Sequence, residues 1–292
     1  MDLITFIISV FCICDDWLKD KQLRQRGPAP TMSDSEVLTM EIVGEFLGYD
    51  EDKALYDFFR RYWHELFPAI ATIDRTTFVR QAANLWSVKQ QLWQALLAEV
   101  VHDEQISIVD SFPLPVCRFA RANRCKLFKS AAAFGYDEVA KQTYYGFRMH
   151  VRICWPGVIV STTITPANVH DLHALDDLTE DVQGWLLGDR NYWSPQQTTR
   201  LAEQGLQLLA PFKSKKREKK RWPLWLVHMR RRIETVFGQL VGRFQVKKVW
   251  ARDMWHFCSR WLRKILSHTF AIFFAQQVGL ESPLQFAGLI TD

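Results

Sequence analysis

The feature that most constrains the fold is a change of hydrophobic pattern near residue 104. Before it, apolar side chains recur at helical spacing. After it, three segments have the pattern of strands: "QISIVDSFPLPV" (105–116), "QTYYGFRMHVRICW" (142–155) and "GVIVSTTIT" (157–165). Pro156-Gly157 predicts a tight turn between the last two. The chain should therefore consist of a helical part followed by a part that contains a sheet.

Helices and strands then alternate along the rest of the chain. A helix rich in acids is predicted to begin at Asn168 or at His170-Asp171, and an apolar run ends on Asp189. The later segments are a helix at about 194–204, a strand "LQLLAPF" and two amphipathic or apolar helices at 225–244 and 254–279. This order predicts an α/β fold in which antiparallel hairpins lead into parallel strands.

The N-terminal part reads as a helical domain over residues 1–103, followed by one domain over 104–292. "TMSDSEVLTMEIVGEFLG" opens with Ser33 three residues before Glu36, which is a capping-box signature. Further helical patterns occupy residues 53–67 and 75–100. The apolar run 3–14 lacks a basic flank and is shorter than a membrane span of about 20 residues, so it predicts a buried helix of a soluble protein.

Basic residues are concentrated in the last two thirds of the chain. Up to Gln105 there are 10 Lys and Arg against 17 Asp and Glu, whereas the remainder carries a net charge of +12. A basic loop is predicted at 211–225, and it holds seven cations: Lys213, Lys215, Lys216, Arg217, Lys219, Lys220 and Arg221. Such a run can be a solvated loop, but the release of counterions favours binding to a nucleic-acid backbone.

The six cysteines form no C-x-x-C pair and have no zinc-site spacing. This usage is typical of reduced proteins in the cytosol. We therefore expect a cytoplasmic protein.

Three acids share one kind of context. Asp110 ends an apolar strand, Asp189 ends another, and Glu234 lies on an amphipathic helix that should pack on the same sheet. A lone carboxylate in apolar surroundings is costly unless it is paired or bound to a cation. Two or three gathered carboxylates suit magnesium, which takes few protein ligands.

Each acid also has a purely structural explanation. Asp110 could cap the turn at 111–113, Asp189 could pair with Arg190, and Glu234 could pair with Arg230 four residues earlier. Taken together with the basic loop, the three acids favour metal-assisted chemistry on phosphodiesters.

Five motifs in a fixed order resemble the bacterial insertion-sequence transposases of the DDE type, most closely the group numbered nine-eighty-two. The motifs are "IVDSFPLPVC", "YYGFRMHV", "TPANVHD", "GDRNYW" and "RRRIETVFGQL". The resemblance implies a ribonuclease-H-like mixed sheet flanked by helices, with Asp110, Asp189 and Glu234 as the catalytic triad. It also implies two Mg²⁺ ions, replaceable by Mn²⁺, with Asp110 bridging both.

The resemblance further implies double-stranded DNA as the partner. Such an enzyme binds the terminal inverted repeats, cuts at the element ends and joins the 3′-OH ends to target DNA, acting at the nucleoid as a homodimer or larger assembly. Arg230 and Arg231 lie one helical turn before Glu234 and could hold a phosphate. The pattern Y-x2-R-x3-E-x6-K of many relatives is incomplete, since Val227 and Val241 stand at its ends, and Arg243 or Lys247 could substitute.

Secondary positions have two explanations each. His170 and Asp171 could line the site, or the acid could stabilise a helix start. Tyr192 and Trp193 could stack on an unpaired base or pack against the sheet, and Arg190 is a further accessory candidate. His150 is expected to be a hydrogen-bonded core histidine, and end recognition by the N-terminal helices would rest on Arg75 and Arg80.

Two other functions remain open for this sequence. A ribonuclease-H-like nuclease would cut DNA without joining it. A non-catalytic relative of a transposase would bind DNA without magnesium-dependent cleavage. No G-x-S-x-G motif supports a small-molecule hydrolase.

Overall fold

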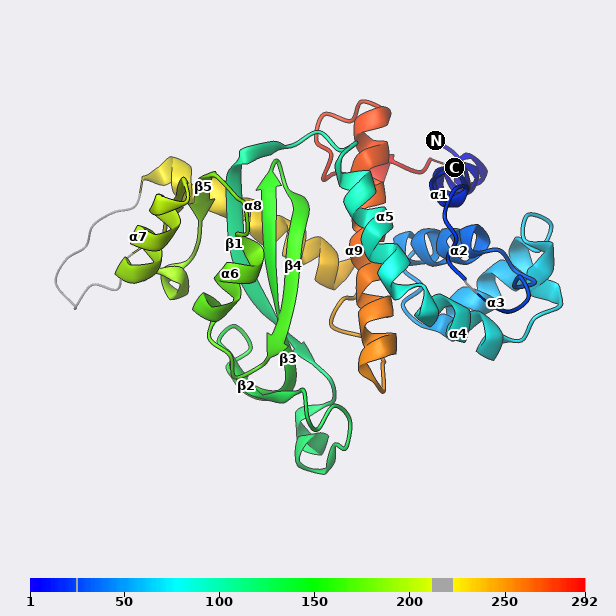
Figure 1. The fold of residues 1–292 in the computed structure, drawn as a ribbon, viewed down its shortest axis with the longest axis horizontal. Helices are drawn as coiled ribbons and strands as arrows, with labels where there is room; N and C mark the ends of the chain where they lie inside the picture. The colour runs from blue at the N-terminus through cyan, green and yellow to red at the C-terminus, as the bar shows by residue number, and fades with distance from the viewer. Residues whose placement is uncertain (25, 212–222, 292) are drawn as a thin grey trace. The chain divides into compact units, whose positions relative to one another are not determined.

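The computed structural model describes residues 1–24, 26–211 and 223–291 (Figure 1). Two compact units make up the chain: the first combines Met1–Val100 with Leu240–Asp292, and the second is Val101–Gln239. The sequence predicted a domain boundary between residues 103 and 104, with residues 104–292 as one domain. In the structure, residues 240–292 instead join the N-terminal helices. The seven cations of the predicted basic loop, between residues 213 and 221, lie outside the described residues.

The first unit is helical throughout its described part. Its α-helices are α1 (Leu3–Leu18), α2 (Asp34–Phe46), α3 (Asp52–Tyr62), α4 (Arg75–Asn84), α5 (Trp86–Leu97) and α9 (Met254–Gln277). Two 3-10 helices complete it, at Pro68–Ala71 and Phe286–Gly288. The capping box is confirmed, because the Ser33 hydroxyl accepts from the Glu36 amide and the Glu36 carboxylate accepts from the Ser33 amide. Helix α9 is mostly buried and packs on α5 and α2.

The apolar start of the chain forms a helix, as predicted, but only one side of it is buried, and Ile4 and Ile8 are exposed. Phe6, Ile7, Val10 and Cys14 of α1 are buried, and the Phe6 ring packs against Phe46 of α2 with ring centroids 4.8 Å apart. Over the described ranges, no helix combines the length and the apolar character that crossing a membrane requires.

Ionised side chains lie inside the helical core. Lys89 of α5 is 2.5 Å from Glu41 of α2, and Glu45 of α2 accepts from Arg263 at 2.5 Å and from Lys264 at 2.8 Å on α9. All five side chains are at most 1% exposed. Each charge has an opposite charge beside it, which is the condition for ionised groups to be tolerated in a core.

The second unit contains one mixed sheet. Its strands are β1 (Asp103–Pro115), β2 (Ala133–Asp137), β3 (Gln142–Trp155), β4 (Val158–Pro166), β5 (Gly184–Leu187) and β6 (Leu206–Leu209). The order is β2-β3-β1-β5-β6, with β4 also paired to β3. Pairs among β1 to β4 are antiparallel, whereas β1-β5 and β5-β6 are parallel. The predicted passage from hairpins to parallel strands is confirmed, and β2 is a strand that the sequence pattern did not reveal.

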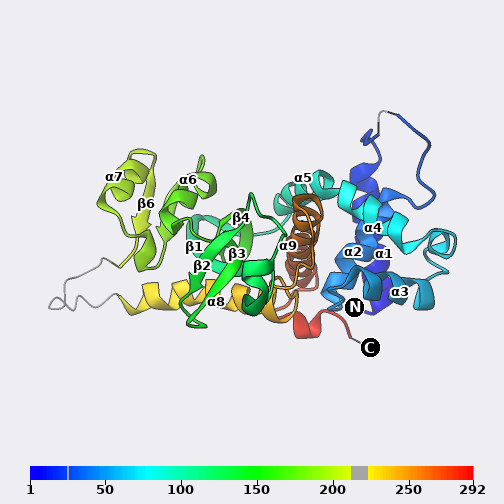
Figure 2. The ribbon, with the colours of Figure 1, turned by 90° about the horizontal axis from the view of Figure 1, so that it is seen from below.

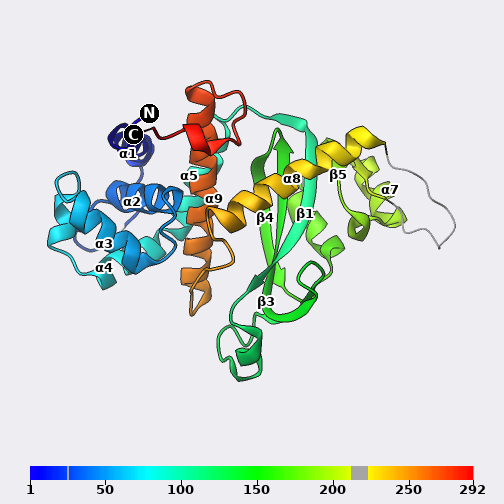
Figure 3. The same ribbon diagram turned by 180° about the vertical axis from the view of Figure 1, so that it is seen from behind.

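Helices cover both faces of this sheet. On one face, 3-10 segment Asp171–Ala174, α6 (Leu175–Leu178) and α7 (Pro195–Glu203) close a core cluster that contains Val109 and Leu186. On the other face runs α8 (Leu224–Gly242), whose path across the strands is visible in Figures 2 and 3. Side chains alternate between the faces of a strand, so the residues next to Val109 and Leu186 face α8.

Two ring contacts place α8 on that face. The rings of Trp225 and Trp185 lie 5.8 Å apart, and those of Phe237 and Phe112 lie 4.7 Å apart, measured between centroids. Trp185 belongs to β5 and Phe112 to β1, so α8 crosses both parallel strands.

The predicted turn between β3 and β4 is also confirmed. The Gly157 amide donates to the Cys154 carbonyl at 2.8 Å. Gly157 has a φ of +139°, which a residue with a side chain rarely adopts. The tight turn keeps β3 and β4 in an antiparallel pair that extends to Phe147 and Pro166.

Candidate active site

Asp110 and Asp189 both follow the paired segments of the neighbouring parallel strands β1 and β5. In the parallel β1-β5 pair, Ile108 is in register with Leu187. Asp110 lies two residues after Ile108, and Asp189 lies two residues after Leu187. Both aspartates therefore lie beyond the carboxyl ends of the paired segments of β1 and β5. Neighbouring positions in register point to the same face, and by alternation this is the face that α8 covers. Carboxyl ends of parallel strands are where ligands of open α/β sheets bind.

One detail of the prediction for Asp110 is corrected. The aspartate does not end its strand, because β1 continues to Pro115 and Asp110 is in register with Val151 of β3. The strand continues because β3 is long enough to pair with it as far as Gly146. Asp110 ends only the part of β1 that pairs with β5, and the predicted cap of a turn at 111–113 is therefore absent.

Hydrogen bonds from the backbone hold both carboxylates. The Ser111 amide donates to Asp110 Oδ1 at 2.8 Å. Asp189 Oδ1 accepts from the Asn191 amide at 2.8 Å, and Oδ2 accepts from Asn191 Nδ2 at 3.2 Å. Asp189 is thus the N-cap of a 3-10 turn at Arg190–Tyr192 rather than the ion-pair partner of Arg190. Both aspartates are half-buried.

Gly188 allows the turn after β5 to close. A Cβ atom at this position would lie 2.9 Å from Cβ of Tyr192, closer than side chains pack. The absence of a side chain lets the Tyr192 ring fold back beneath the chain. This close approach fixes Asp189 immediately after the strand, which explains why the dipeptide Gly-Asp stands there.

The two carboxylates are electrostatically unfavourable in this structure. Burial, with the negative charge of Asp189 adding to it, raises the pKa of Asp110 to about 7 despite the lowering effect of the Ser111 amide and Arg230. Burial also raises the pKa of Asp189, with the charge of Asp171 adding to it. A cation placed between the two carboxylates would stabilise their ionised forms.

Glu234 is linked to the two aspartates by Arg230, which forms an ion pair with it. Arg230 Nη2 is 3.4 Å from Glu234 Oε1, so the predicted structural pairing is present. The same arginine lowers the pKa of both Asp110 and Asp189 by its positive charge. The Glu234 side chain is 57% exposed and that of Arg230 is 30% exposed. Glu234 is therefore at the solvent side of the carboxylate pair, with an arginine common to all three acids.

Packing fixes the face of α8 that bears Glu234. Phe237 lies three residues after Glu234 on this helix and touches Phe112, which lies two residues after Asp110 on β1. Residues three apart share one side of a helix, and residues two apart share one face of a strand. The helix side with Phe237 is consequently turned toward the strand face with Asp110, and Glu234 lies at the exposed border of that side.

Asp171 belongs to a separate group of polar side chains on the other face of β1. Ser111 Oγ donates to Asp171 Oδ1 at 2.8 Å, and Arg148 Nη1 donates to the same oxygen at 3.2 Å. The Asp171 side chain is only 7% exposed. Neither Ser111 nor Arg148 was singled out from the sequence, although Arg148 is two residues before His150 and so shares its face of β3.

His150 is the hydrogen-bonded core histidine that the sequence predicted. It is fully buried, and its Nε2 is 2.9 Å from Thr165 Oγ1. Burial lowers the pKa of His150 to about 4, despite the opposing charge of Asp171. The ring is therefore neutral at physiological pH.

The other accessory candidates take different positions. Tyr192 is fully buried in the core cluster with Leu186 and Leu201, so it packs against the sheet and cannot stack on a base. His170 Nδ1 accepts from the Leu172 amide at 3.2 Å and caps the 3-10 helix. Arg190 is exposed and Trp193 is half-buried.

The candidate DNA-binding arginines divide between the two units. Arg231 is exposed beside Arg230 on α8, in the second unit. Arg243 belongs to the first unit, where its Nε donates to the Phe46 carbonyl at 3.1 Å and its guanidinium lies 4.2 Å from the Phe46 ring centroid. Arg243 is half-buried there, and its contact with DNA stays a prediction.

Within the described residues, no three Asp, Glu, His or Cys side chains converge tightly enough to form a ready-made metal site. The donor set is nevertheless suitable for a hard cation, because two half-buried carboxylates with raised pKa values lie adjacent. Glu234 would have to release its ion pair with Arg230 in order to bind the same cation as the two aspartates.

Comparison with known proteins identifies the second unit. Residues 101–254 match the family model described as a transposase DDE domain. No curated protein matches the chain. Among solved structures it is similar to piggyBac transposase in a synaptic complex with hairpin DNA, at 10% sequence identity over 97% of this chain and 76% of that one, with a TM-score of 0.49. Because the family model spans just over half of the chain and includes Asp110, Asp189 and Glu234, the chain belongs to the DDE transposase domain family.

Proposed function

We propose that the chain is the transposase of a bacterial insertion sequence, of the kind that the group numbered nine-eighty-two represents. In this proposal it binds the terminal inverted repeats as a homodimer or larger assembly at the nucleoid. It cleaves DNA at the element ends and joins the 3′-OH ends to target DNA. The family match supports transposase chemistry, and the motif resemblance supports the narrower assignment.

The observation that carries the proposal is the pair of aspartates that follow the registered residues Ile108 and Leu187. Asp110 and Asp189 follow Ile108 and Leu187, which are paired across two parallel strands, although 79 positions separate the two acids in the sequence. Backbone amides orient both carboxylates. Burial raises the pKa of both, and neighbouring negative charge adds to the increase, from Asp189 at Asp110 and from Asp171 at Asp189. A protein that needed these residues only for stability would gain from replacing one of them.

The sheet order supports a ribonuclease-H-like catalytic fold. Along β4-β3-β1-β5-β6, three antiparallel strands are followed by two parallel ones, with helices on both faces. We assign the catalytic acids to the point where the sheet changes from antiparallel to parallel pairing, since β1 has both kinds of neighbour there. The same strand thus presents Asp110 where its pairing with β5 ends.

Magnesium is the proposed cofactor, with Mn²⁺ able to replace it. Asp110 and Asp189 would hold it, and Glu234 would complete the set after releasing Arg230. Bound divalent ions supply an activated water or 3′-hydroxyl for in-line attack and stabilise the leaving oxygen. Once released, Arg230 can donate to a phosphate oxygen of the DNA, with Arg231 as its exposed neighbour.

A strand-transfer assay tests this function. Purified protein is incubated with Mg²⁺, a duplex carrying the inverted repeat that flanks the gene, and a target plasmid. The proposal expects cleavage at the repeat and joining of its 3′ end to the plasmid. Cleavage without joining would indicate a nuclease, and binding without cleavage would indicate a non-catalytic relative.

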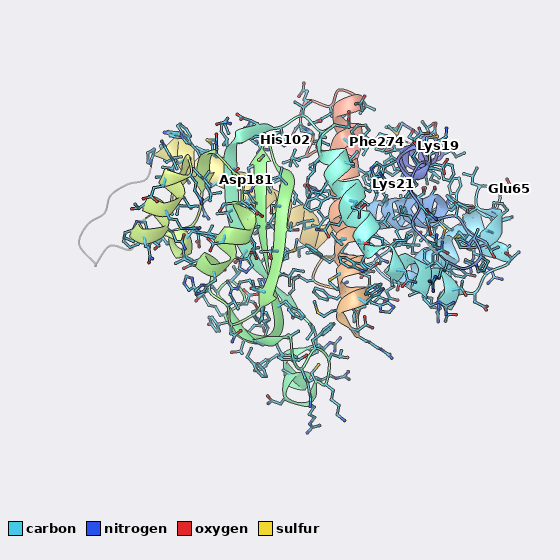
Figure 4. The ribbon with its side chains drawn as sticks, in the orientation of Figure 1. Lys19, Lys21, Glu65, His102, Asp181 and Phe274 are labelled. Carbon is cyan, nitrogen blue, oxygen red and sulfur yellow. The ribbon has the colours of Figure 1, made fainter. Side chains whose placement is uncertain are left out.

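A matched control variant is available in the same unit. Asp181→Asn removes one carboxylate from an exposed residue with a φ of +56°, a conformation that asparagine tolerates. Its position is labelled in Figure 4. This control should cleave and join DNA at the wild-type rate, whereas Asp189→Asn should do neither.

A further inference from the structure

The segment between β1 and β2 carries a dense positive charge that the proposed chemistry does not use. Residues 117–129, "CRFARANRCKLFK", are named here the basic arm. It contains five cations, all of them exposed: Arg118, Arg121, Arg124, Lys126 and Lys129. No acidic residue occurs between Asp110 and Asp137. The arm is therefore a cluster of one charge sign, and all of it lies within the described part of the second unit.

The basic arm is an ordered structure with an apolar anchor. Tyr145 of β3 donates its hydroxyl to the Leu127 carbonyl at 3.2 Å and accepts, through its own carbonyl, from the Val116 amide at 3.0 Å. Phe128 is buried, with its ring 5.4 Å from that of Phe147, and Ala122 is buried beneath the 3-10 turn at 119–124. These contacts turn the apolar side of the arm inward and leave the cations outside.

Over the described part of the chain, these cations lack carboxylate partners. Among residues that the structure describes, none of the five forms an ion pair. Phe119, between two of the arginines, is 55% exposed. Five neighbouring cations repel one another, and an anionic partner would remove that repulsion. The regular partner for such a surface is a chain of phosphates.

The position of the arm relative to the carboxylates follows from β1. Asp110 and Pro115 are on the same strand, and five residues of strand span about 17 Å. Figures 1 and 3 show the arm protruding beyond the ends of β1 and β3. At about 3.4 Å per base pair, this separation corresponds to roughly five base pairs of duplex, or half a helical turn.

We propose that the basic arm is a second DNA contact, which binds the phosphate backbone of the duplex about half a turn from the phosphate at Asp110 and Asp189. This inference rests on the proposed function for the position of the DNA. Because the contact is to phosphates, it adds affinity without sequence preference. It positions the duplex so that one phosphate remains at the carboxylate pair.

The test uses the full chain with Arg118, Arg121 and Arg124 all changed to glutamine. Binding to a duplex of about 30 base pairs and random sequence is measured by fluorescence anisotropy in EDTA, at salt concentrations from about 50 to 300 mM. Each lost phosphate contact lowers the slope of log affinity against log salt by about 0.9. The expected result is a slope reduced by two to three, and affinity lowered on the order of 100-fold at physiological salt.

The matched control changes the same number of exposed cations elsewhere. Lys19, Lys21 and Arg26 follow α1 in the first unit, and the two lysines are labelled in Figure 4. Their triple change to glutamine should leave the salt slope within error of wild type. Equal losses in both triple variants would mean that net charge alone matters, and would overturn the inference.

Two further measurements keep the result independent of misfolding and of the proposed function. The single change Arg121→Gln should lower the slope by about one with an unchanged melting temperature. Wild-type affinity and slope in the triple arm variant would overturn the inference even if the wild-type protein cleaves DNA. Conversely, if the wild-type protein fails to cleave in Mg²⁺ but its binding depends on the arm, the inference stands and the proposed function fails.

Discussion

The two units handle buried charge in opposite ways. In the helical unit, Glu41, Glu45, Lys89, Arg263 and Lys264 are almost wholly buried, and each has an opposite charge beside it. In the sheet unit, burial and neighbouring negative charge raise the pKa values of Asp110 and Asp189, against the opposing positive charge of Arg230. Opposite charges that pair with one another stabilise the packing of helices. Charges of one sign that lie close together would instead be stabilised by an external cation.

The largest effect should come from the carboxylate pair. Asp110→Asn or Asp189→Asn should lower DNA cleavage by on the order of 1,000-fold or more, because metal ligation supplies several kcal/mol to such reactions. Gel analysis of end-bearing duplexes measures the loss.

The same variants should leave the unfolding free energy equal to or above that of wild type, since each removes a repelling charge. DNA affinity in EDTA should stay close to wild type. Cleavage at the wild-type rate by either variant would contradict the assignment of the site.

Removing one buried charge from the helical unit should lower its unfolding free energy, in contrast to the aspartate variants of the sheet unit. Lys89→Met leaves Glu41 with a weaker set of partners in the core, and breaking a buried pair costs about 3–5 kcal/mol. Urea denaturation monitored by circular dichroism measures this loss. The double change Glu41→Leu/Lys89→Met should recover much of it, because it removes the unpaired charge. If Lys89→Met were as stable as wild type, the pairing would have no structural role.

Asp52 allows a test of the helical unit by pH. Burial would raise the pKa of this carboxyl, but Arg263 and Arg260 outweigh it and hold the pKa at about 2. Because its pKa is lowered in the folded state, ionised Asp52 contributes to the unfolding free energy at pH values above its ordinary pKa near 4. That contribution is lost as the pH falls through about 2. The contribution is about 2 kcal/mol.

The unfolding free energy of the wild-type protein should therefore decline between about pH 4 and pH 2 more steeply than that of Asp52→Asn. Denaturation at several pH values gives both curves. Parallel curves over this interval would show that the two arginines do not stabilise ionised Asp52.

The smallest effect on stability should come from the pair between Arg230 and Glu234. With side chains 30% and 57% exposed, this pair should contribute less than about 1 kcal/mol. Arg230→Gln should therefore change the urea midpoint little but still reduce cleavage and DNA affinity. A large loss of stability with normal cleavage would reverse the proposed role of this arginine.

Local signals in the sequence predicted most of the elements. Ser33 and Glu36 identified the start of α2, and Pro156-Gly157 identified the turn between β3 and β4. The strand β2 escaped notice because it is short and its exposed aromatics, Phe134 and Tyr136, do not form an alternation that extends beyond five residues. The helical run 75–100 divides at Leu85, which leaves helical geometry with ψ of 13°.

The site was only partly predictable for a related reason. Asp110, Asp189 and Glu234 could be selected because each follows or interrupts an apolar pattern. Ser111 and Arg148 could not, since their importance lies in contacts with Asp171, 60 and 23 positions away along the chain. Tyr192 could not be assigned either, because a tyrosine in a turn has the same local sequence whether its ring is buried or exposed.

The sequence by itself determined most of the helices and strands, the passage from antiparallel to parallel pairing, and the three acids that we propose as catalytic. Only the tertiary structure decided that residues 240–292 join the N-terminal helices, that Asp171 lies on the far face of β1, and that Arg230 stands between Glu234 and the aspartates. Hydrophobic periodicity is a local property, so it can be seen in a single segment. Electrostatic partnership depends on distances in space, and these exist only after the chain has folded.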